Sequence, residues 1–105
     1  KKFDLIACPV TATTAFPIGE RPLKIDNQKV NWLWGAFPFT APFNVSGNPA
    51  VSIPCGIDEN LPVGLQLVGN LNSEEMMLNF CEDLEGQLGF DDKLIRQKWA
   101  LENEK

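Results

Sequence analysis

Proline divides the first 62 residues of this chain into short segments. The sequence contains eight prolines, and all of them precede residue 63. A proline fixes its own φ, lacks the N–H that helices and central strands use, and turns the preceding residue away from helical geometry. This part of the chain therefore favours short strands and extended loops, and the long regular helix is expected after it.

Three apolar segments of the chain are predicted to be strands. Residues 4–8 form a short apolar run that is followed by Pro9, and residues 50–54 alternate between apolar and polar positions and end with Pro54. In residues 63–69, the apolar side chains of Val63, Leu65 and Leu67 lie on one face. The last two segments are expected to pair as a hairpin. Residues 20–31 are polar and aperiodic, which predicts a surface loop, and the aromatic-rich segment 32–43 is expected to be irregular.

One firm helix is predicted near residues 73–88, with Asn72 as its N-cap and with Gly86 and Gly89 as stop signals. Its apolar side chains recur at helical spacing, at Met77, Cys81, Leu84 and Leu88. A second, shorter helix is expected over residues 91–101, because two acids favour its start. The side chains expected to face a core from that helix are Leu94, Ile95 and Trp99.

The composition excludes several classes of function. Histidine is absent, so the chain holds no Ser-His-Asp triad, Cys-His pair or His-ligated metal, and we expect no metal or cofactor. The net charge is −5, whereas nucleic-acid binders need clustered cations, so no direct contact with nucleic acid is expected. No apolar run approaches the ~20 residues that span a bilayer. The three cysteines are widely spaced, which predicts free thiols in a reducing cytoplasm.

The predicted elements make an α/β chain that is incomplete as a stand-alone domain. Three short strands with one covering helix leave a sheet edge and a sheet face unprotected. The aromatic segment 32–43 has no obvious partner within the chain. Long connections without regular structure are uncommon inside a compact domain. We therefore expect residues 1–105 to be part of something larger.

Three blocks of the sequence resemble the amidase signature family. The first runs from Asp4 to Glu20 and contains DLIACP and TTAFPIGE. The second, FTAPFNVSGNPAVSIPCG, covers residues 39–56 and is the most specific. The third, LPVGLQLVG, covers residues 61–69 and is followed by a Ser-Glu-Glu helix start. All three stand in the family's order and cover most of residues 4–85.

The resemblance implies the C-terminal portion of a longer amidase with a mixed β-sheet covered by helices. Enzymes of this family hydrolyse carboxamides with a serine nucleophile, a second serine on a cis peptide bond and a lysine base, in a Gly/Ser-rich stretch that lies upstream of these blocks. This chain has no such stretch, and Ser46, Ser52 and Ser73 are its only serines. No catalytic residue is therefore assigned to the chain, and on its own it is expected to be inactive. A mechanism of this kind also needs no histidine.

The resemblance places candidate substrate-binding residues in the aromatic segment and the turn after it. In the glutamine-using transamidase subunits of the family, an acidic residue stands three positions before the threonine that matches Thr40. Phe37 occupies that place here, which favours a general amidase with a less polar substrate. Trp34 would extend the same apolar wall, and Asn44 is a further candidate. Packing in a core for the two aromatic residues, and turn formation for Thr40 and Asn44, are the alternatives.

Three functions remain open at this stage. The first is a general amidase that acts on a small-molecule amide. Its expected partner is the N-terminal part of the same enzyme, and the enzyme could form a homo-oligomer. The second is the A subunit of a transamidase that amidates mischarged tRNA. The third is a non-catalytic module for protein association, because the aromatic segment is also suited to be a contact surface.

Overall fold

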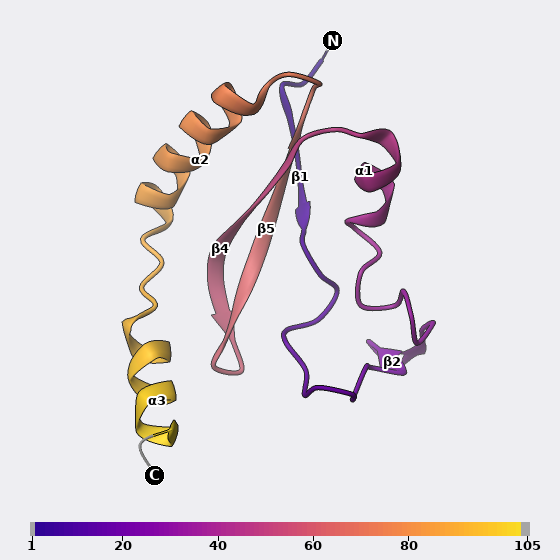
Figure 1. Ribbon diagram of the computed structural model, residues 1–105, viewed down its shortest axis with the longest axis vertical. Coiled ribbons are helices and arrows are strands. Elements are labelled where there is room, and N and C mark those ends of the chain that lie inside the picture. Colours follow the sequence, from indigo (N-terminus) through magenta and orange to yellow (C-terminus); the bar gives the residue numbers. More distant parts are fainter. Residues whose placement is uncertain (1, 104–105) are drawn as a thin grey trace.

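The computed structural model describes residues 2–103, the side chain of Leu94 excepted. Its elements, in chain order, are β1 (Leu5–Pro9), β2 (Lys24–Ile25), β3 (Gln28–Lys29), α1 (Ala41–Ser46), β4 (Ala50–Asp58), β5 (Leu61–Gly69), α2 (Glu74–Leu88) and α3 (Lys93–Asn103). This is a mixed α/β arrangement, as the sequence predicts. Figure 1 shows α2 on one side of the sheet, and the long connection between β1 and α1 on the other.

The main sheet has three antiparallel strands in the order β1-β5-β4. β5 lies in the centre, paired with β1 from Leu5 opposite Gly69 and with β4 from Ala50 opposite Val68. The segment predicted over 63–69 begins earlier, at Leu61, because a turn of only two residues joins β4 to β5. Both turn residues, Glu59 and Asn60, have positive φ, which is the geometry that suits a tight hairpin.

β4 continues beyond the end that Pro54 predicts. The strand runs to Asp58, and its register with β5 shifts between Pro54 and Gly56. A proline is tolerated here because β4 is an edge strand of this sheet and a bulge interrupts the ladder directly after it. The extra residue at the bulge is Cys55, whose Sγ donates to the Val63 carbonyl at 3.5 Å.

A small core lies between α2 and the sheet. Ile53, Leu67 and Cys81 form its buried cluster, and Met77 is the most deeply buried large side chain. α2 approaches the sheet closely at Gly69, where an added Cβ would lie 2.6 Å from the Met77 Sδ. The predicted helix face is therefore buried at Met77 and Cys81, and Leu84 is partly buried. Leu88, at the end of the same face, is exposed.

The ends of α2 follow the sequence signals only in part. The helix ends at Gly89, which takes the left-handed conformation and bonds through its N–H to the Glu85 carbonyl. The N-cap is Ser73 instead of Asn72. Asn72 itself has a φ of 65°, which is far from the extended geometry of an N-cap, so its side chain does not cap the helix.

Two elements lie in segments that the sequence predicts to be irregular. The expected loop over 20–31 contains the hairpin of β2 and β3, whose turn residues Asp26 and Asn27 both have positive φ. The segment 32–43, expected to be irregular, ends in the short helix α1, which Gly47 closes in the left-handed conformation. Proline disfavours a helix only in its interior, and Pro42 stands in the first turn of α1.

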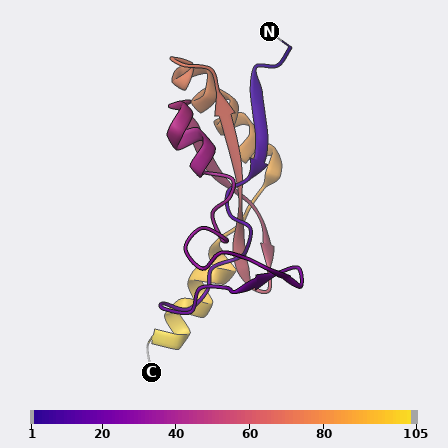
Figure 2. The same cartoon turned by 90° about the vertical axis from the view of Figure 1, so that its right-hand side faces the viewer.

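α3 lies apart from the core, beyond the β4–β5 turn (Figures 1 and 2). The Asp91 carboxylate accepts the Lys93 N–H at 2.9 Å and so satisfies a donor at the start of the helix. Trp99 is 67% exposed, which contradicts its predicted place in a core. α3 cannot bury it because the helix follows the strands instead of covering them. The side chain of Leu94 lies outside the described residues.

The described part of the chain is too extended to bury its own apolar side chains. Its radius of gyration is 16.0 Å, whereas a compact chain of this length has about 13 Å. Trp32 and Trp34 are 55% and 61% exposed, and β1 and β4 form the two edges of the sheet. These apolar surfaces need cover that residues 2–103 do not provide. Within the same residues, every helix is too short or too polar to cross a bilayer.

Candidate functional site

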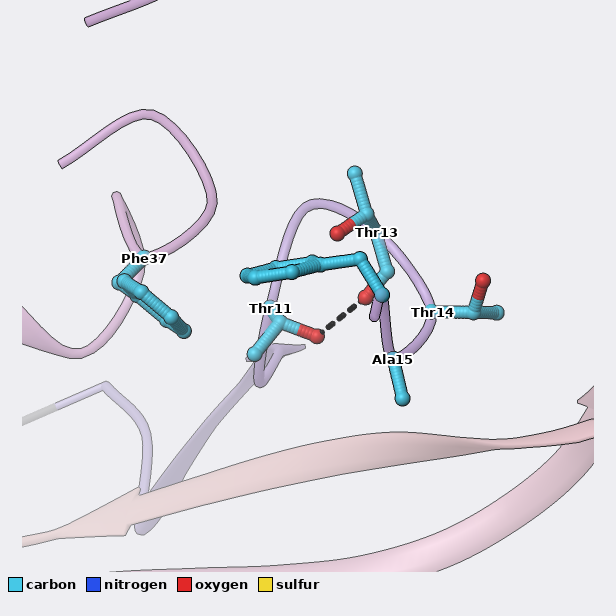
Figure 3. A pocket seen from close by; sticks show the side chains of 6 residues that line it. Thr11, Thr13, Thr14, Ala15 and Phe37 are labelled. Atoms are coloured by element: carbon cyan, nitrogen blue, oxygen red, sulfur yellow. Dashed lines mark hydrogen bonds between the residues drawn. The ribbon is translucent and has the colours of Figure 1, made fainter. Parts of the chain in front are cut away.

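Two neighbouring hollows share the Phe37 side chain as a common wall. The first, of about 350 Å³, is lined by Thr11, Thr13, Thr14, Ala15, Phe16 and Phe37. Figure 3 shows Phe37 facing the connection that follows β1. The second, of about 450 Å³, lies beside the β2–β3 hairpin and is lined by Ala12, Ile25, Gln28, Lys29, Val30, Asn31, Trp34, Gly35, Phe37, Pro38 and Ala41. Both are largely apolar, which suits an uncharged organic group.

The segment that forms the first hollow is held by hydrogen bonds from three directions. The Val10 N–H donates to the Gly64 carbonyl at 3.3 Å, which continues the sheet past β1. The Ala12 N–H donates to the carbonyl of the buried Ala36 at 3.0 Å. Within the segment, the Thr11 hydroxyl donates to the Thr13 carbonyl at 2.6 Å (Figure 3). The floor of the hollow is therefore tied both to the sheet and to the aromatic segment.

Asn31 folds the aromatic segment into turns that place Phe37. Its Oδ1 accepts from the backbone N–H groups of Leu33 and Trp34 at 2.8 and 3.0 Å. The Gly35 N–H reaches the Asn31 carbonyl, and the Phe37 N–H donates to the Trp34 carbonyl at 2.9 Å. Asparagine favours such turns because its short side chain bonds the backbone two or three residues ahead. The Phe37 ring then lies 6.5 Å from the Phe16 ring, at a tilt of 51°.

The Thr13 hydroxyl is a buried polar atom at the edge of the first hollow. It has no hydrogen-bond partner within residues 2–103. An unpaired buried hydroxyl costs free energy, and a bound ligand with a carbonyl or N–H group would relieve that cost. Sequence reasoning did not single out Thr13. The run of three threonines between residues 11 and 14 is the signal that marks it.

Gln66 links the centre of the sheet to the end of the aromatic segment. It is the buried polar residue of β5, and its Nε2 donates to the Phe39 carbonyl at 2.9 Å and contacts the Cys8 Sγ at 3.1 Å. Because β5 is the central strand, this link fixes the segment before α1 relative to the most rigid part of the fold. The sequence reasoning missed this link, since polar residues on strands usually face solvent.

Replacing Gln66 by leucine is expected to destabilise the intact protein by about 1–3 kcal/mol, because the Phe39 carbonyl then loses its donor inside the fold. Urea denaturation measures the change. Gln87→Leu, at an exposed position of α2, is the matched control and is expected to change stability by less than about 0.5 kcal/mol. Equal stability of the two variants would show that Gln66 does not hold the segment.

The four predicted substrate-binding residues divide into two pairs. Phe37 lines both hollows, and Trp34 lines the second one. Thr40 and Asn44 line neither hollow and lie at the start of α1, where the Asn44 N–H donates to the Thr40 carbonyl at 3.2 Å. The backbone of Thr40 is helical and its side chain makes no capping bond. The structure therefore brings the aromatic pair together at a hollow and uses the polar pair to begin a helix.

The serines and cysteines of the chain lie in structural environments. The hydroxyls of Ser46 and Ser73 donate to backbone carbonyls of the same turn, at 3.4 and 2.6 Å. Burial, and secondarily the Glu85 carboxylate, raises the pKa of the Cys81 thiol above its ordinary value, so this thiol stays protonated at neutral pH. Cys8, Cys55 and Cys81 are all free, but Cys55 is exposed.

Comparison with known proteins identifies the family. The amidase family matches residues 1–78, which is most of the chain. The chain belongs to the amidase family. A solved bacterial aryl acylamidase of the amidase signature family shares 31% identity with it, at a TM-score of 0.56. That match covers 66% of this chain and 15% of the other, and it supports the predicted fold class.

Curated relatives of this amidase-family chain include components of a transamidase. The first A subunit of the glutamyl-tRNA(Gln) amidotransferase of Clostridium acetobutylicum is 36% identical over 94 residues, covering 90% of this chain and 18% of the relative. The corresponding A subunit from Clostridium botulinum, strain Eklund 17B, is 40% identical over 85 residues, covering 81% of this chain and 16% of the relative. The chain thus spans less than a fifth of the length of these relatives.

Proposed function

We propose that this chain is the C-terminal part of an amidase that hydrolyses a carboxamide C–N bond. The observation that carries the proposal is the apolar hollow at Phe37, built from the family's first sequence block and the aromatic segment in a chain that belongs to the amidase family. In this proposal the hollow holds the acyl group of the substrate. The Thr13 hydroxyl supplies a hydrogen bond at its edge.

The bond-breaking groups in this proposal belong to the rest of the enzyme. By resemblance to the family, a serine attacks the amide carbonyl while a neutral lysine, its pKa lowered by burial, takes the serine proton. Backbone N–H groups stabilise the oxyanion that forms, the amine leaves with the returned proton, and water then hydrolyses the acyl-serine to release the carboxylic acid and regenerate the serine. This chain contributes a rigid wall that keeps the carbonyl in place, because β5 and Gln66 anchor the segment that carries Phe37.

The partners follow from the same proposal. They are a small-molecule amide and the N-terminal part of the same enzyme, which also covers the exposed tryptophans and the sheet edges. The acidic balance of the chain argues against direct contact with nucleic acid. Free thiols in the chain favour a cytoplasmic location. A homo-oligomer is compatible with the apolar surface that the chain exposes.

The A subunit of a transamidase is the second candidate, because curated relatives of the chain bear that name. The position of Phe37 weighs against it. A phenylalanine offers a substrate ammonium no more than a weak cation–π contact, where a carboxylate would form an ion pair. Poor use of glutamine is therefore expected, and robust release of ammonia from glutamine would favour the transamidase.

The test compares the intact enzyme with the isolated 105-residue chain. The intact enzyme is expected to release amine from acyl anilides or ammonia from simple carboxamides, and the isolated chain is expected to give no turnover above buffer. An intact enzyme that cleaves no amide overturns the proposal. An isolated chain that is monodisperse, melts cooperatively and binds a protein partner favours the association module instead.

A further inference from the structure

Arg21 carries a positive charge next to the Phe37 ring. Its guanidinium carbon lies 4.9 Å from the centre of the Trp32 ring and 5.9 Å from the centre of the Phe37 ring. One of its nitrogens, Nη1, donates to the Leu33 carbonyl at 2.9 Å. The two rings and the carbonyl thus hold the charge in one place, and the side chain is half-buried.

This charge is not neutralised by a carboxylate of the described chain. Within residues 2–103, no Asp or Glu oxygen lies within the 4.0 Å of an ion pair from the Arg21 guanidinium. The other charged groups of the segment are the exposed side chains of Glu20, Lys24, Asp26 and Lys29. Water and salt screen exposed charges strongly, whereas a half-buried charge between two rings is screened less. Arg21 is therefore the least screened charge of this segment, and it lies next to Phe37.

The distance to the hollow makes that charge relevant to a ligand. A group in contact with the Phe37 ring lies about 4 Å from it. It is then within about 10 Å of the guanidinium, since the ring centre is 5.9 Å away. At an effective dielectric constant of about 20, two unit charges at this separation interact strongly enough to change the binding or the kcat/KM of a charged substrate about tenfold relative to a neutral one. Lys29, which lines the second hollow, carries charge of the same sign.

We propose that Arg21 is a specificity-determining residue that makes the Phe37 pocket reject cationic acyl groups and accept neutral or anionic ones. The proposal rests on the proposed amidase function and names the substrate class of the same site. Arg21 does not touch the reacting atoms in this account. It acts through its charge, at a position that Trp32, Phe37 and the Leu33 carbonyl define.

The test uses the intact enzyme and three para-nitroanilides of matched acyl length, those of butyric, gamma-aminobutyric and succinic acid. The wild type is expected to cleave the ammonium-bearing substrate with about tenfold lower kcat/KM than the butyryl substrate. The succinyl substrate is expected to be cleaved at least as well as the butyryl one. Arg21→Gln keeps a donor for the Leu33 carbonyl and removes the charge, so its three kcat/KM values are expected to agree within about threefold.

Arg21→Lys is the matched control, because it keeps the charge and loses the planar guanidinium. It is expected to retain the preference against the ammonium-bearing substrate. If Arg21→Gln lowers all three kcat/KM values by the same factor, Arg21 only braces the aromatic segment and the proposal is overturned. A wild-type enzyme that cleaves none of the three overturns the proposed function, and this inference with it.

A second measurement covers the case in which Arg21→Gln does not fold. The wild-type preference between the butyryl and gamma-aminobutyryl substrates is measured at low and at high salt. Because the preference is electrostatic, it is expected to shrink as salt rises, whereas the rate for the neutral substrate stays nearly constant. A preference that does not change with salt would arise from shape alone and would contradict the proposal.

Discussion

Met77→Ala is expected to lower the free energy of unfolding of the intact enzyme by about 2–5 kcal/mol. Met77 is fully buried, and its Sδ and Cγ pack against the backbone of β5 at Gly69, where no side chain intervenes. The substitution removes apolar contacts and leaves a cavity that the closely approaching helix cannot fill. Urea or thermal denaturation measures the loss.

The control for this variant is Asn79→Ala, on the exposed side of the same helix. It alters helix propensity slightly and removes no core contact, so a change of less than about 0.5 kcal/mol is expected. If Met77→Ala proved as stable as Asn79→Ala, the packing of α2 on β5 would not hold this part of the enzyme together.

Phe37→Ala is expected to reduce kcat/KM for a neutral amide by about ten- to a hundredfold, mainly by raising KM. Phe37 is the wall that both hollows share, and burying an apolar group against such a ring contributes about 1.5–3 kcal/mol. Each 1.4 kcal/mol corresponds to about a factor of ten. Steady-state kinetics of the intact enzyme with a para-nitroanilide substrate measure the effect.

Two further variants separate a pocket role of Phe37 from a structural one. Phe37→Leu keeps an apolar wall, so it is expected to raise KM less than the alanine variant does, by about tenfold at most. Trp99→Ala removes a large ring from α3, away from the hollows, and is expected to leave kcat/KM nearly unchanged (Figure 1). Equal losses in Phe37→Ala and Trp99→Ala would contradict the pocket assignment.

Local sequence signals locate the strands and the long helix well. The segments expected over 4–8, 50–54, 63–69 and 73–88 lie within or next to β1, β4, β5 and α2. Apolar periodicity and helix-ending glycines involve residues that are close together in the chain, so they can be recognised from the sequence alone. Gly89 ends α2 with positive φ for this reason.

Some sequence patterns give a wrong prediction because their outcome depends on which other element packs beside them. Pro54 is compatible with β4 only because this strand lies at an edge of the sheet and bulges directly after the proline. The prediction that Trp99 faces a core is wrong because helical spacing says which side chains share a face, and nothing about whether another element covers that face. The β2–β3 hairpin is too short to show an alternating pattern.

The candidate site is predictable from the sequence in its aromatic half only. Trp34 and Phe37 stand close in sequence, so their common location follows from local geometry. Thr13 and Arg21 are distant from Phe37 along the chain and meet it only through the folding of the β1–α1 connection, whereas Gln66 of the sheet reaches the same segment at the Phe39 carbonyl. No periodic pattern in the sequence predicts contacts between residues so far apart in the chain.

The sequence alone determined the class of this protein. The three amidase blocks already assign it to the family, and that resemblance predicts that the nucleophile and the base lie outside these blocks. The tertiary structure decided where polar and charged groups meet the apolar wall, and how much apolar surface the chain leaves uncovered. The physical reason is the sequence distance over which the interactions act. Secondary structure depends on residues a few positions apart in the chain. Burial, the electrostatic potential of Arg21 and the Gln66 hydrogen bonds depend on residues that become neighbours only in the folded chain.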